Sequence, residues 1–384
     1  MSREQNLLIL GASARAAAHS ALRAGLYPLC ADLFADADLQ AVCPVLPIAS
    51  ERYPAGLEAL IDRDVPGPWM YTGALENQPE FVSHLAKKRE LWGNTAKTLR
   101  YVRDPFWVSN LLSKANLPCP QVRDPGSNLE PGSRWLVKPL HGAGGRGIRF
   151  SNEKTRSEKD SVFLQEFIPG LPCAAVFVGI GNGAVLLGVT EQLIGQPWLN
   201  VTPFIYCGSI GPLLLDPHTQ AILEGMGGAL AMKAQISGLF GIDLILRDGL
   251  PWIVEVNPRY TASVEVLEFA HGLKALKWHR RAFVEDNESG AVADSRVGGA
   301  FVGKAILFAK TKLTFPKDGP WTAEVRRGFR PDVMPAFADI PQVDLPIVRG
   351  RPILTLFAKA DSRANCLEML KEMAADLDRW LFGR

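Results

Sequence analysis

Residues 238–259 have the sequence GLFGIDLILRDGLPWIVEVNPR, and this stretch decides the fold. Asp248 and Gly249 form a two-residue turn signal between two apolar runs, which predicts a β-hairpin. Asp243 lies on the first strand and Glu255 on the second, so their side chains are expected to face each other across the pair. Asn257 follows on the same side of its strand, because side chains alternate between the two faces.

The polar side chains of this hairpin need a partner, since an unpaired buried carboxylate is costly. Oxygen atoms of two carboxylates and one amide suit Mg²⁺, which takes few protein ligands together with substrate phosphates. The alternative is a cross-strand polar pair without a metal. The combination of Asp243, Glu255 and Asn257 favours the metal site.

A glycine-rich loop precedes the hairpin in the chain. The stretch RWLVKPLHGAGGRGIRF, residues 134–150, places Lys138 on one strand and begins a second strand near Ile148. Glycines at this density let backbone N–H groups converge on a phosphate, and Arg146 and Arg149 add positive charge. The pattern is not the GxxxxGK[ST] of a P-loop. Taken alone, the loop favours a flexible β-hairpin with a surface lysine, but the motifs that follow favour a nucleotide-binding flap.

Composition excludes several classes of protein. The chain has 384 residues, of which 47% are hydrophobic and 21% charged, and a net charge of +2. Such a length predicts two or three domains, and so small a charge gives no field for nucleic acid or anionic membranes. The six cysteines include no CxxC pair, which predicts neither a zinc site nor a disulfide framework. The N-terminal apolar run is too short for a signal peptide, and no segment approaches the ~18 apolar residues of a membrane span. We therefore expect a soluble, cytoplasmic protein.

The start of the chain follows a strand–turn–helix–strand pattern. An apolar run over residues 6–10 stops at Gly11, a helical stretch follows, and a second strand ends in Asp32. This βαβ start implies a parallel sheet, although its turn is not GxGxxG and NAD binding is a weak inference. We predict a Rossmann-like domain over 1–94, a helical linker over 95–132, a central nucleotide- and metal-binding domain over 133–290, and a β-rich segment with a terminal helix over 291–384.

Together these motifs resemble those of the ATP-grasp superfamily. A lysine before a glycine-rich flap, the QEFIPG stretch at 165–170 and the D…ExNPR hairpin follow one another in that family's order. The closer similarity is to the ATP-dependent carboligases related to biotin carboxylase, which have tyramine–glutamate ligases among their relatives. The resemblance implies an α/β and α+β multidomain chain, in which an ATP-grasp fold follows an N-terminal Rossmann-like, parallel-sheet (pre-ATP-grasp) domain.

The resemblance also implies roles for single residues. Lys138 would bind the α- and β-phosphates of ATP, and Arg259 would lie near the γ-phosphate or the acylphosphate. These two are the expected catalytic residues. Asp243, Glu255 and Asn257 would hold one or two Mg²⁺ ions, with Mn²⁺ as a substitute. The other expected nucleotide-binding residues lie in the flap and in the backbone that meets adenine: Gly142, Gly144, Gly145, Arg146, Gly147, Glu166 and Ile168.

Three positions depart from the family pattern. A lysine expected in the helical segment is replaced by Pro105, and Arg103 is the candidate to take its place. An acidic ribose ligand, expected two residues after the hinge glycine, is replaced by Pro172. The glutamate base of biotin carboxylase, four residues after the arginine, is Ser263 here, which weakens a bicarbonate-dependent reaction.

Four residues are candidates for substrate binding. Ser13 and Arg15 lie at a predicted helix N-terminus, which suits a carboxylate, although a solvated helix residue explains Arg15 equally well. Glu76 lies in a predicted loop and is a candidate to hold an amine. Tyr206 lies in a glycine-turned stretch that either lines the acceptor pocket or forms a plain β-turn.

These features predict an ATP-dependent carboxylate–amine ligase, which forms an amide-type bond through an acylphosphate and converts ATP to ADP and phosphate. Its partners would be a small carboxylate and a small amine, and relatives often form homodimers. The first alternative is a biotin-carboxylase-like carboxylase. The second is a catalytically silent nucleotide-binding module, which Pro105 and Pro172 support.

Overall fold

The N-terminal part of the chain is a four-stranded parallel sheet in the order β3-β2-β1-β4. The computed structural model describes residues 5–127, 129, 132–151, 161–284 and 299–383. The apolar run from Leu7 to Leu10 is fully buried, as expected for a parallel strand that is covered on both faces. The strands are β1 Gln5–Gly11, β2 Leu26–Asp32, β3 Val45–Pro47 and β4 Trp69–Tyr71.

One large antiparallel sheet contains both the central and the C-terminal strands. Its order is β13-β12-β9-β10-β11-β14-β18-β16, so the C-terminal strands extend the central sheet through the β11–β14 pair. The strands are β9 Leu171–Ile180, β10 Gly183–Ile194, β11 Tyr206–Gly211, β12 Gly238–Arg247, β13 Leu250–Asn257, β14 Phe301–Phe308, β16 Phe337–Ala338 and β18 Pro352–Ala360.

A smaller antiparallel sheet carries the glycine loop. Its order is β5-β8-β6-β7, and the loop connects β6 to β7 as the turn of a hairpin. Strand β6 therefore presents Lys138 directly before the loop. The strands are β5 Val122–Arg123, β6 Trp135–Pro139, β7 Arg149–Phe150 and β8 Val162–Glu166, and a separate short pair consists of β15 Leu313–Thr314 and β17 Pro346–Ile347.

Helices connect and cover these sheets, and none of those described is long and apolar enough to cross a membrane. The α-helices are α1 Arg15–Arg23, α2 Ala37–Gln40, α3 Glu58–Ile61, α4 Pro79–Ala86, α5 Ala96–Val102, α6 Pro105–Lys114, α7 Pro217–Ala234, α8 Ala262–His271, α9 Ala275–Arg281, α10 Thr322–Arg327 and α11 Arg363–Phe382. The 3₁₀-helices are η1 Ser50–Arg52, η2 Ala55–Leu57, η3 Leu75–Asn77 and η5 Pro197–Leu199.

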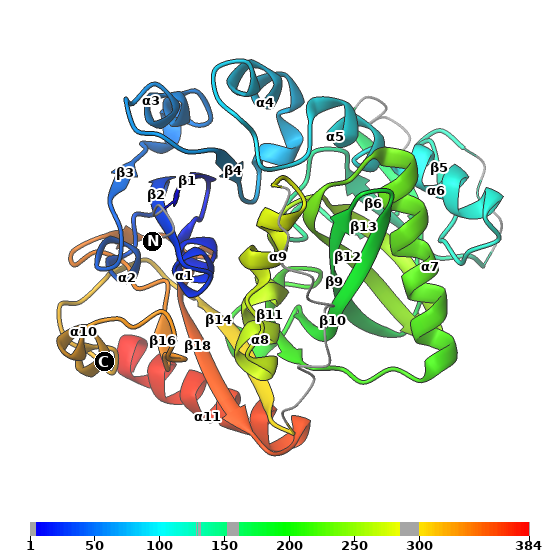
Figure 1. Ribbon diagram of the computed structural model, residues 1–384. Coiled ribbons are helices and arrows are strands. Elements are labelled where there is room, and N and C mark those ends of the chain that lie inside the picture. Colours follow the sequence, from blue (N-terminus) through cyan, green and yellow to red (C-terminus); the bar gives the residue numbers. More distant parts are fainter. Residues whose placement is uncertain (1–4, 128, 130–131, 152–160, 285–298, 384) are drawn as a thin grey trace.

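Alternation along β9 gives the large sheet two different cores. Phe177 points toward α7 and stacks on Phe240, with ring centroids 5.2 Å apart. Val176 and Val178 point to the other face, where they share a core with α1, α8 and α9. Figure 1 shows this arrangement: α8 and α9 lie between the blue N-terminal domain and the green strands, and α7 lies on the far side. The N-terminal domain is thereby packed against the large sheet through two helices.

The terminal helix α11 packs on the C-terminal strands of the same sheet. Ser362 accepts a hydrogen bond from the backbone N–H of Asn365 and so caps the helix. Leu370 and Leu377 belong to the core that also contains strands β14 and β18. The apolar spacing of this segment therefore marks its buried face, as the sequence predicted.

We predict that Phe177→Ala will lower the free energy of unfolding by about 3–5 kcal/mol, because it removes a fully buried ring from the core under α7. The ring lies so close to α7 that a Cβ on Gly227 would come within 2.4 Å of it. Urea titration followed by tryptophan fluorescence measures the change. The matched control is Leu214→Ala, whose side chain is 82% exposed and which should shift stability by no more than about 0.5 kcal/mol. Equal losses in both variants would contradict the packing described here.

Candidate active site

The two carboxylates of the β12–β13 hairpin face each other because the strand pair contains a β-bulge. Pairing from the turn runs in strict register as far as Leu244 opposite Ile253, and the register then shifts so that Asp243 pairs with Glu255. Without this shift Asp243 would lie opposite Val254. The bulge leaves Val254 out of the ladder, as bulges beside functional sites often do.

The backbone carbonyl of Val254 holds the lysine that precedes the glycine loop. Its oxygen accepts hydrogen bonds from Nζ of Lys138 at 3.0 Å and from Nε2 of Gln165 at 3.3 Å. Lys138 also donates to Oε1 of Gln165 at 3.1 Å. Burial lowers the pKa of Lys138, although Glu255 and Asp243 act in the opposite direction. The ammonium group is thus fixed beside both carboxylates.

The two carboxylates differ in how well the protein compensates their charge. Burial raises the pKa of Asp243 to about 7, and the neighbouring Glu255 adds to the rise against the effect of Arg259 and Lys138. Burial acts in the same direction on Glu255, but Arg103 and Lys138 outweigh it and lower the pKa of that carboxyl group. The negative charge on Asp243 is therefore incompletely balanced by protein groups. A cation bound between the two would supply the missing charge.

The donor atoms fit Mg²⁺ after one rearrangement. Asp243 and Glu255 offer carboxylate oxygens, but Asn257 turns Nδ2 toward Oδ2 of Asp243 at 3.1 Å and Oδ1 toward Nη2 of Arg259 at 3.1 Å. The amide of Asn257 has to turn over before its oxygen can meet a metal. No group of three or more His, Cys, Asp or Glu side chains within the described ranges is arranged to hold a metal. Mg²⁺ does not need such a group, because it takes most of its ligands from water and phosphate.

A cavity of about 380 Å³ lies along the hairpin. Lys138, Asp243, Glu255 and Asn257 line it, and so does Arg259. The flap contributes Gly144 and Gly145 to the lining, and β8 with the segment after it contributes Glu166 and Ile168. Two of the predicted substrate residues, Glu76 and Tyr206, also line the cavity. A smaller cavity of about 70 Å³ shares Lys138 and Glu255 with it and is lined by Gly142 and Arg146. Of the predicted flap residues, Gly147 instead packs on Pro139.

The glycine loop is folded onto strand β11 and the residues before it. The carbonyl oxygen of Gly144 accepts a hydrogen bond from the backbone N–H of Tyr206 at 3.2 Å. Gly145 approaches Phe204 so closely that a Cβ there would come within 1.8 Å of the Phe204 carbonyl oxygen. Its φ of 80° also lies in the region that favours glycine. The loop can therefore reach this position only with glycine at 145.

Arg103 supplies a positive charge beside the hairpin. Its guanidinium forms an ion pair with Glu255 and donates to Oδ1 of Asn77 at 3.0 Å and to the carbonyl oxygen of Gly142 at 3.2 Å. Pro105, which stands where the family lysine is expected, is the first residue of α6. Arg103 thus joins the flap, the N-terminal domain and the hairpin.

Arg259 pairs with a carboxylate from the N-terminal domain. Oε1 of Glu76 accepts a hydrogen bond from Nε of Arg259 at 2.8 Å and forms an ion pair with Nη2 at 2.6 Å. Burial opposes the charge of the arginine, but Glu76 outweighs it and raises the pKa of Arg259. The second carboxylate oxygen of Glu76 is buried and has no hydrogen-bond partner among the residues that the structure describes.

Tyr206 begins strand β11, so its stretch is a strand and not the plain β-turn considered from the sequence. Its hydroxyl shares a hydrogen bond of 2.9 Å with Ser209, which lies 3.4 Å from Oγ of Ser263. Ser263 also accepts from Thr190 at 2.9 Å. The position four residues after Arg259 therefore holds a hydroxyl group within a hydroxyl network.

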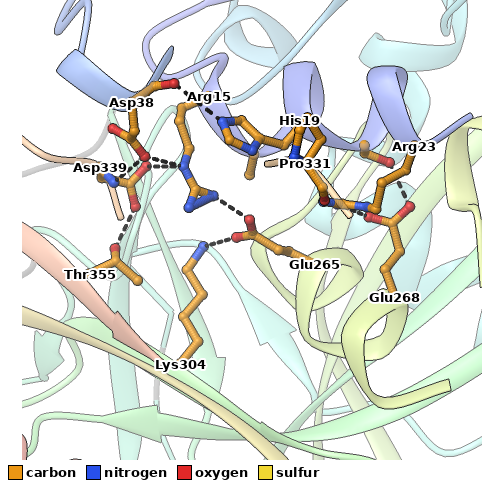
Figure 2. A network of polar contacts seen from close by, with 12 residues as sticks. Arg15, His19, Arg23, Asp38, Glu265, Glu268, Lys304, Pro331, Asp339 and Thr355 are labelled. Atoms are coloured by element: carbon orange, nitrogen blue, oxygen red, sulfur yellow. Dashed lines mark hydrogen bonds and ion pairs between the residues drawn. The ribbon is translucent and has the colours of Figure 1, made fainter. Parts of the chain in front are cut away.

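Arg15 is neither the substrate-binding residue nor the solvated helix residue that the sequence predicted, because it is buried and lies outside both cavities. It is fully buried, and its guanidinium forms ion pairs with Asp38, at 2.7 Å, and with Glu265 (Figure 2). Lys304 also pairs with Glu265, at 3.0 Å. These cations lower the pKa of Glu265 to about 2, against the effect of its burial. The carboxylates that Arg15 binds thus belong to the protein itself.

The N-terminus of α1 is occupied by a protein carboxylate as well. Asp32, at the end of β2, accepts from the backbone N–H of Ala14 at 2.5 Å and from those of Phe34 and Ala35 at 2.7 Å. Ser13 is exposed and lies outside both cavities described above. The predicted carboxylate site at Ser13 and Arg15 is therefore taken up by residues whose proximity a linear sequence does not reveal.

Other residues of the site were missed. Gln192 donates to Oδ1 of Asp243 at 3.0 Å, and Phe204 supports the flap. Neither belongs to a motif that could have indicated its position. Gln165 belongs to the QEFIPG stretch, but the sequence analysis predicted no role for it. Its position at the end of a predicted strand is the sequence feature that could have indicated one, since that strand, β8, pairs with the strand of Lys138.

Comparison with known proteins identifies a domain and a fold. A family model described as an ATP-grasp domain matches residues 102–263. An uncharacterised protein of Methanocaldococcus jannaschii is 22% identical over 294 residues, which are 73% of this chain and 67% of that protein. An L-amino acid ligase from Bacillus licheniformis superposes with a TM-score of 0.72 at 17% identity over 98% of both chains. The biotin carboxylase domain of a 2-oxoglutarate carboxylase from Hydrogenobacter thermophilus, a dimer in complex with MgADP and bicarbonate, has a TM-score of 0.70 at 15% identity, over 94% of this chain and 88% of that one.

The predicted fold and the predicted superfamily are therefore confirmed. Residues 102–263 of the chain form an ATP-grasp domain, and the chain as a whole shares the fold of an L-amino acid ligase and of a biotin carboxylase domain.

Proposed function

We propose that this enzyme is an ATP-dependent carboxylate–amine ligase, which joins a small carboxylate to a small amine and converts ATP to ADP and phosphate. One observation carries the proposal. A single cavity is lined by Lys138 and the hairpin carboxylates, and also by Arg259 and Ser263, with no acidic residue at position 263. The similarity to the fold of an L-amino acid ligase supports it.

The residues around the cavity fit the first half of such a reaction. A carboxylate is a poor electrophile until its oxygen carries a phosphoryl group, so the γ-phosphoryl of ATP is transferred to it first. Lys138 would bind the phosphates, and Glu166 and Ile168 would contact adenine through their backbone. Arg259 would stabilise the charge that develops on the transferred group. Mg²⁺ held by Asp243, Glu255 and Asn257 would neutralise phosphate charge.

The flap fits the second half. The acylphosphate reacts with water as well as with an amine, so the site has to exclude water. The loop over Gly142 to Gly147, in contact with Phe204 and Tyr206, would cover the intermediate. No nucleophilic side chain is needed, because the amine is the nucleophile.

Two alternatives are less well supported. A biotin-carboxylase-like enzyme would be expected to carry its glutamate base four residues after Arg259, but Ser263 occupies that position and the nearby Glu265 is held in ion pairs with Arg15 and Lys304. A silent nucleotide-binding module would gain nothing from a buried, incompletely balanced carboxylate pair, which costs stability unless a cation binds there.

The test is ADP formation with Mg²⁺ and ATP, measured against a panel of amino acids, amines and bicarbonate. We expect release that needs one carboxylate together with one amine. Lys138→Ala and Glu255→Gln should each lower kcat/KM by about 100-fold or more. ATP binding without turnover over the whole panel would favour the silent module, and turnover with bicarbonate alone would favour the carboxylase.

Metal binding should depend on pH through Asp243. Its pKa in the metal-free protein is raised to about 7, and only the ionised form binds a metal, so protons compete below that pH. We expect Mn²⁺ affinity to be about tenfold weaker at pH 6 than at pH 8. Electron paramagnetic resonance measures the concentration of free Mn²⁺ and so gives the dissociation constant at each pH. In the control, Asp243→Asn should bind weakly at both pH values, and an unchanged pH dependence in that variant would contradict the assignment.

Flap closure should fail in Gly145→Ala. The new Cβ would overlap the Phe204 carbonyl, whereas in Gly142→Ala the nearest atom would be 3.5 Å away, an ordinary contact. We expect the affinity for ATP to fall by about tenfold or more in Gly145→Ala and to change by less than about threefold in Gly142→Ala. Isothermal titration with ATP and Mg²⁺ compares them. Equal ATP affinities of the two variants would show that ATP binding does not require the contact between the flap and Phe204.

A further inference from the structure

One residue that lines the cavity has a carboxylate oxygen without a partner among the described residues. Glu76 is 2% exposed, and its Oε1 is engaged by Nε and Nη2 of Arg259 at 2.8 and 2.6 Å. Its Oε2 is buried and accepts no hydrogen bond from any residue that the structure describes. Glu76 lines the same cavity as the hairpin residues Asp243 and Asn257. A residue that lines the cavity beside Arg259 thus carries a carboxylate oxygen with no hydrogen-bond partner.

The backbone holds Glu76 in this position under strain. Glu76 lies in η3, and the preceding Ala74 has a φ of 81°, which a residue with a side chain rarely adopts. Such conformations persist where the surrounding structure imposes them, and they cluster at functional sites. Gly73 is packed against the guanidinium, since a Cβ there would lie 3.6 Å from Cζ of Arg259. The turn therefore fits closely around the ion pair.

Two tyrosines also lie near Glu76 among the residues that the structure describes. Burial raises the pKa of Tyr53 and of Tyr71 above the usual range, and the nearby carboxylate adds to the rise. The hydroxyl of Tyr71 donates to the carbonyl oxygen of Asn94 at 2.9 Å, and that of Tyr53 has no partner among the described residues. Among the described residues Arg259 is the cation that pairs with Glu76, and it engages Oε1 alone.

A buried carboxylate oxygen without a partner is costly, so the missing donor is expected to arrive with a ligand. The ligand group has to donate a hydrogen bond, and a positive charge satisfies the anion best. Bicarbonate and phosphate oxygens are repelled by the same carboxylate. An ammonium group has both the donor and the charge.

We propose that Oε2 of Glu76 binds the attacking nitrogen of the second substrate as an ammonium ion and accepts its proton. The acceptor is then a primary amine that enters the site protonated, such as an alkylamine or the α-amino group of an amino acid. This inference rests on the proposed ligase function. It assigns to Glu76 the acid–base role that position 263 cannot fill.

In the proposed step the ammonium nitrogen loses two protons. Glu76 takes one proton from the ammonium, and the nitrogen lone pair attacks the acyl carbon of the acylphosphate. The carbon–nitrogen bond forms, the bond from the carbon to the phosphate oxygen breaks, and phosphate leaves with the electron pair. The second proton of the nitrogen leaves with the phosphate, so one amide, one phosphate and one protonated Glu76 result.

The test compares two nucleophiles in the wild type and in Glu76→Gln. Hydroxylamine is uncharged at neutral pH and traps an acylphosphate as a hydroxamate, so it needs no proton acceptor. The twenty amino acids are first tested as carboxylate donors with hydroxylamine, which identifies the acid. The twenty amino acids, methylamine and ethylamine are then tested as acceptors with that acid, which identifies the amine. We expect Glu76→Gln to form hydroxamate within about threefold of the wild type. Its kcat/KM for the amine should fall by about 100-fold or more, with the KM for ATP unchanged.

Glu76→Gln keeps an oxygen that can accept from Arg259, so its fold is expected to survive, and thermal unfolding checks this. Tyr53→Phe is the matched control, because it removes a buried neighbouring hydroxyl without changing charge, and it should leave both reactions within about threefold. Amide formation at the wild-type rate in Glu76→Gln would mean that Oε2 binds only water, which would overturn the inference. Equal losses of hydroxamate and amide would overturn it as well, since Glu76 would then act only through Arg259. A wild type that forms no hydroxamate with any acid would overturn the ligase function itself.

Discussion

The active site depends on one irregularity in a strand pair. The bulge at Val254 changes the register of the hairpin by one residue, and a one-residue change sends side chains to the opposite face of a sheet. It therefore decides whether Glu255 faces Asp243. The same bulge frees a backbone carbonyl that holds Lys138. The carboxylate pair and the lysine are thus positioned by a single backbone feature. Burial is the main cause of the shifts in the pKa values of Asp243 and Lys138, and the neighbouring charges add to or oppose it.

Much of this arrangement could be predicted from the sequence, because its signals are local. The Asp248–Gly249 turn, the glycine loop after Lys138 and the apolar spacing of α11 each depend on neighbours along the chain. The facing of Asp243 and Glu255 was predicted correctly, but strict pairing from the turn would have put Val254 opposite Asp243. No sequence pattern predicts the bulge, because the hairpin pairs with β9 and contacts Gln165 of β8, and these contacts are not local in the sequence.

Long-range charge pairing could not be predicted. A helix start with Ser13 and Arg15 resembles an open anion site until Asp32 and Asp38 are known to fill it. Partners such as Glu265 lie more than 200 residues away, and their proximity follows from the packing of α1 on α8. Buried ion pairs of this kind stabilise little by themselves, but the loss of one partner is strongly unfavourable. They fix the position of the N-terminal domain on the large sheet.

The pairing of Glu76 with Arg259 divides the cavity between two parts of the chain. The residues around Lys138 and the hairpin are those that we propose to bind the nucleotide, whereas Glu76 comes from the N-terminal domain. Exchange of that domain between enzymes of this architecture offers a route to new acceptor preferences with the nucleotide machinery left in place. Charge balance limits the choice of donor: a domain without a cation at position 15 would remove one of the two cations paired with buried Glu265. Chimeric enzymes should therefore be designed around that arginine as much as around the cavity.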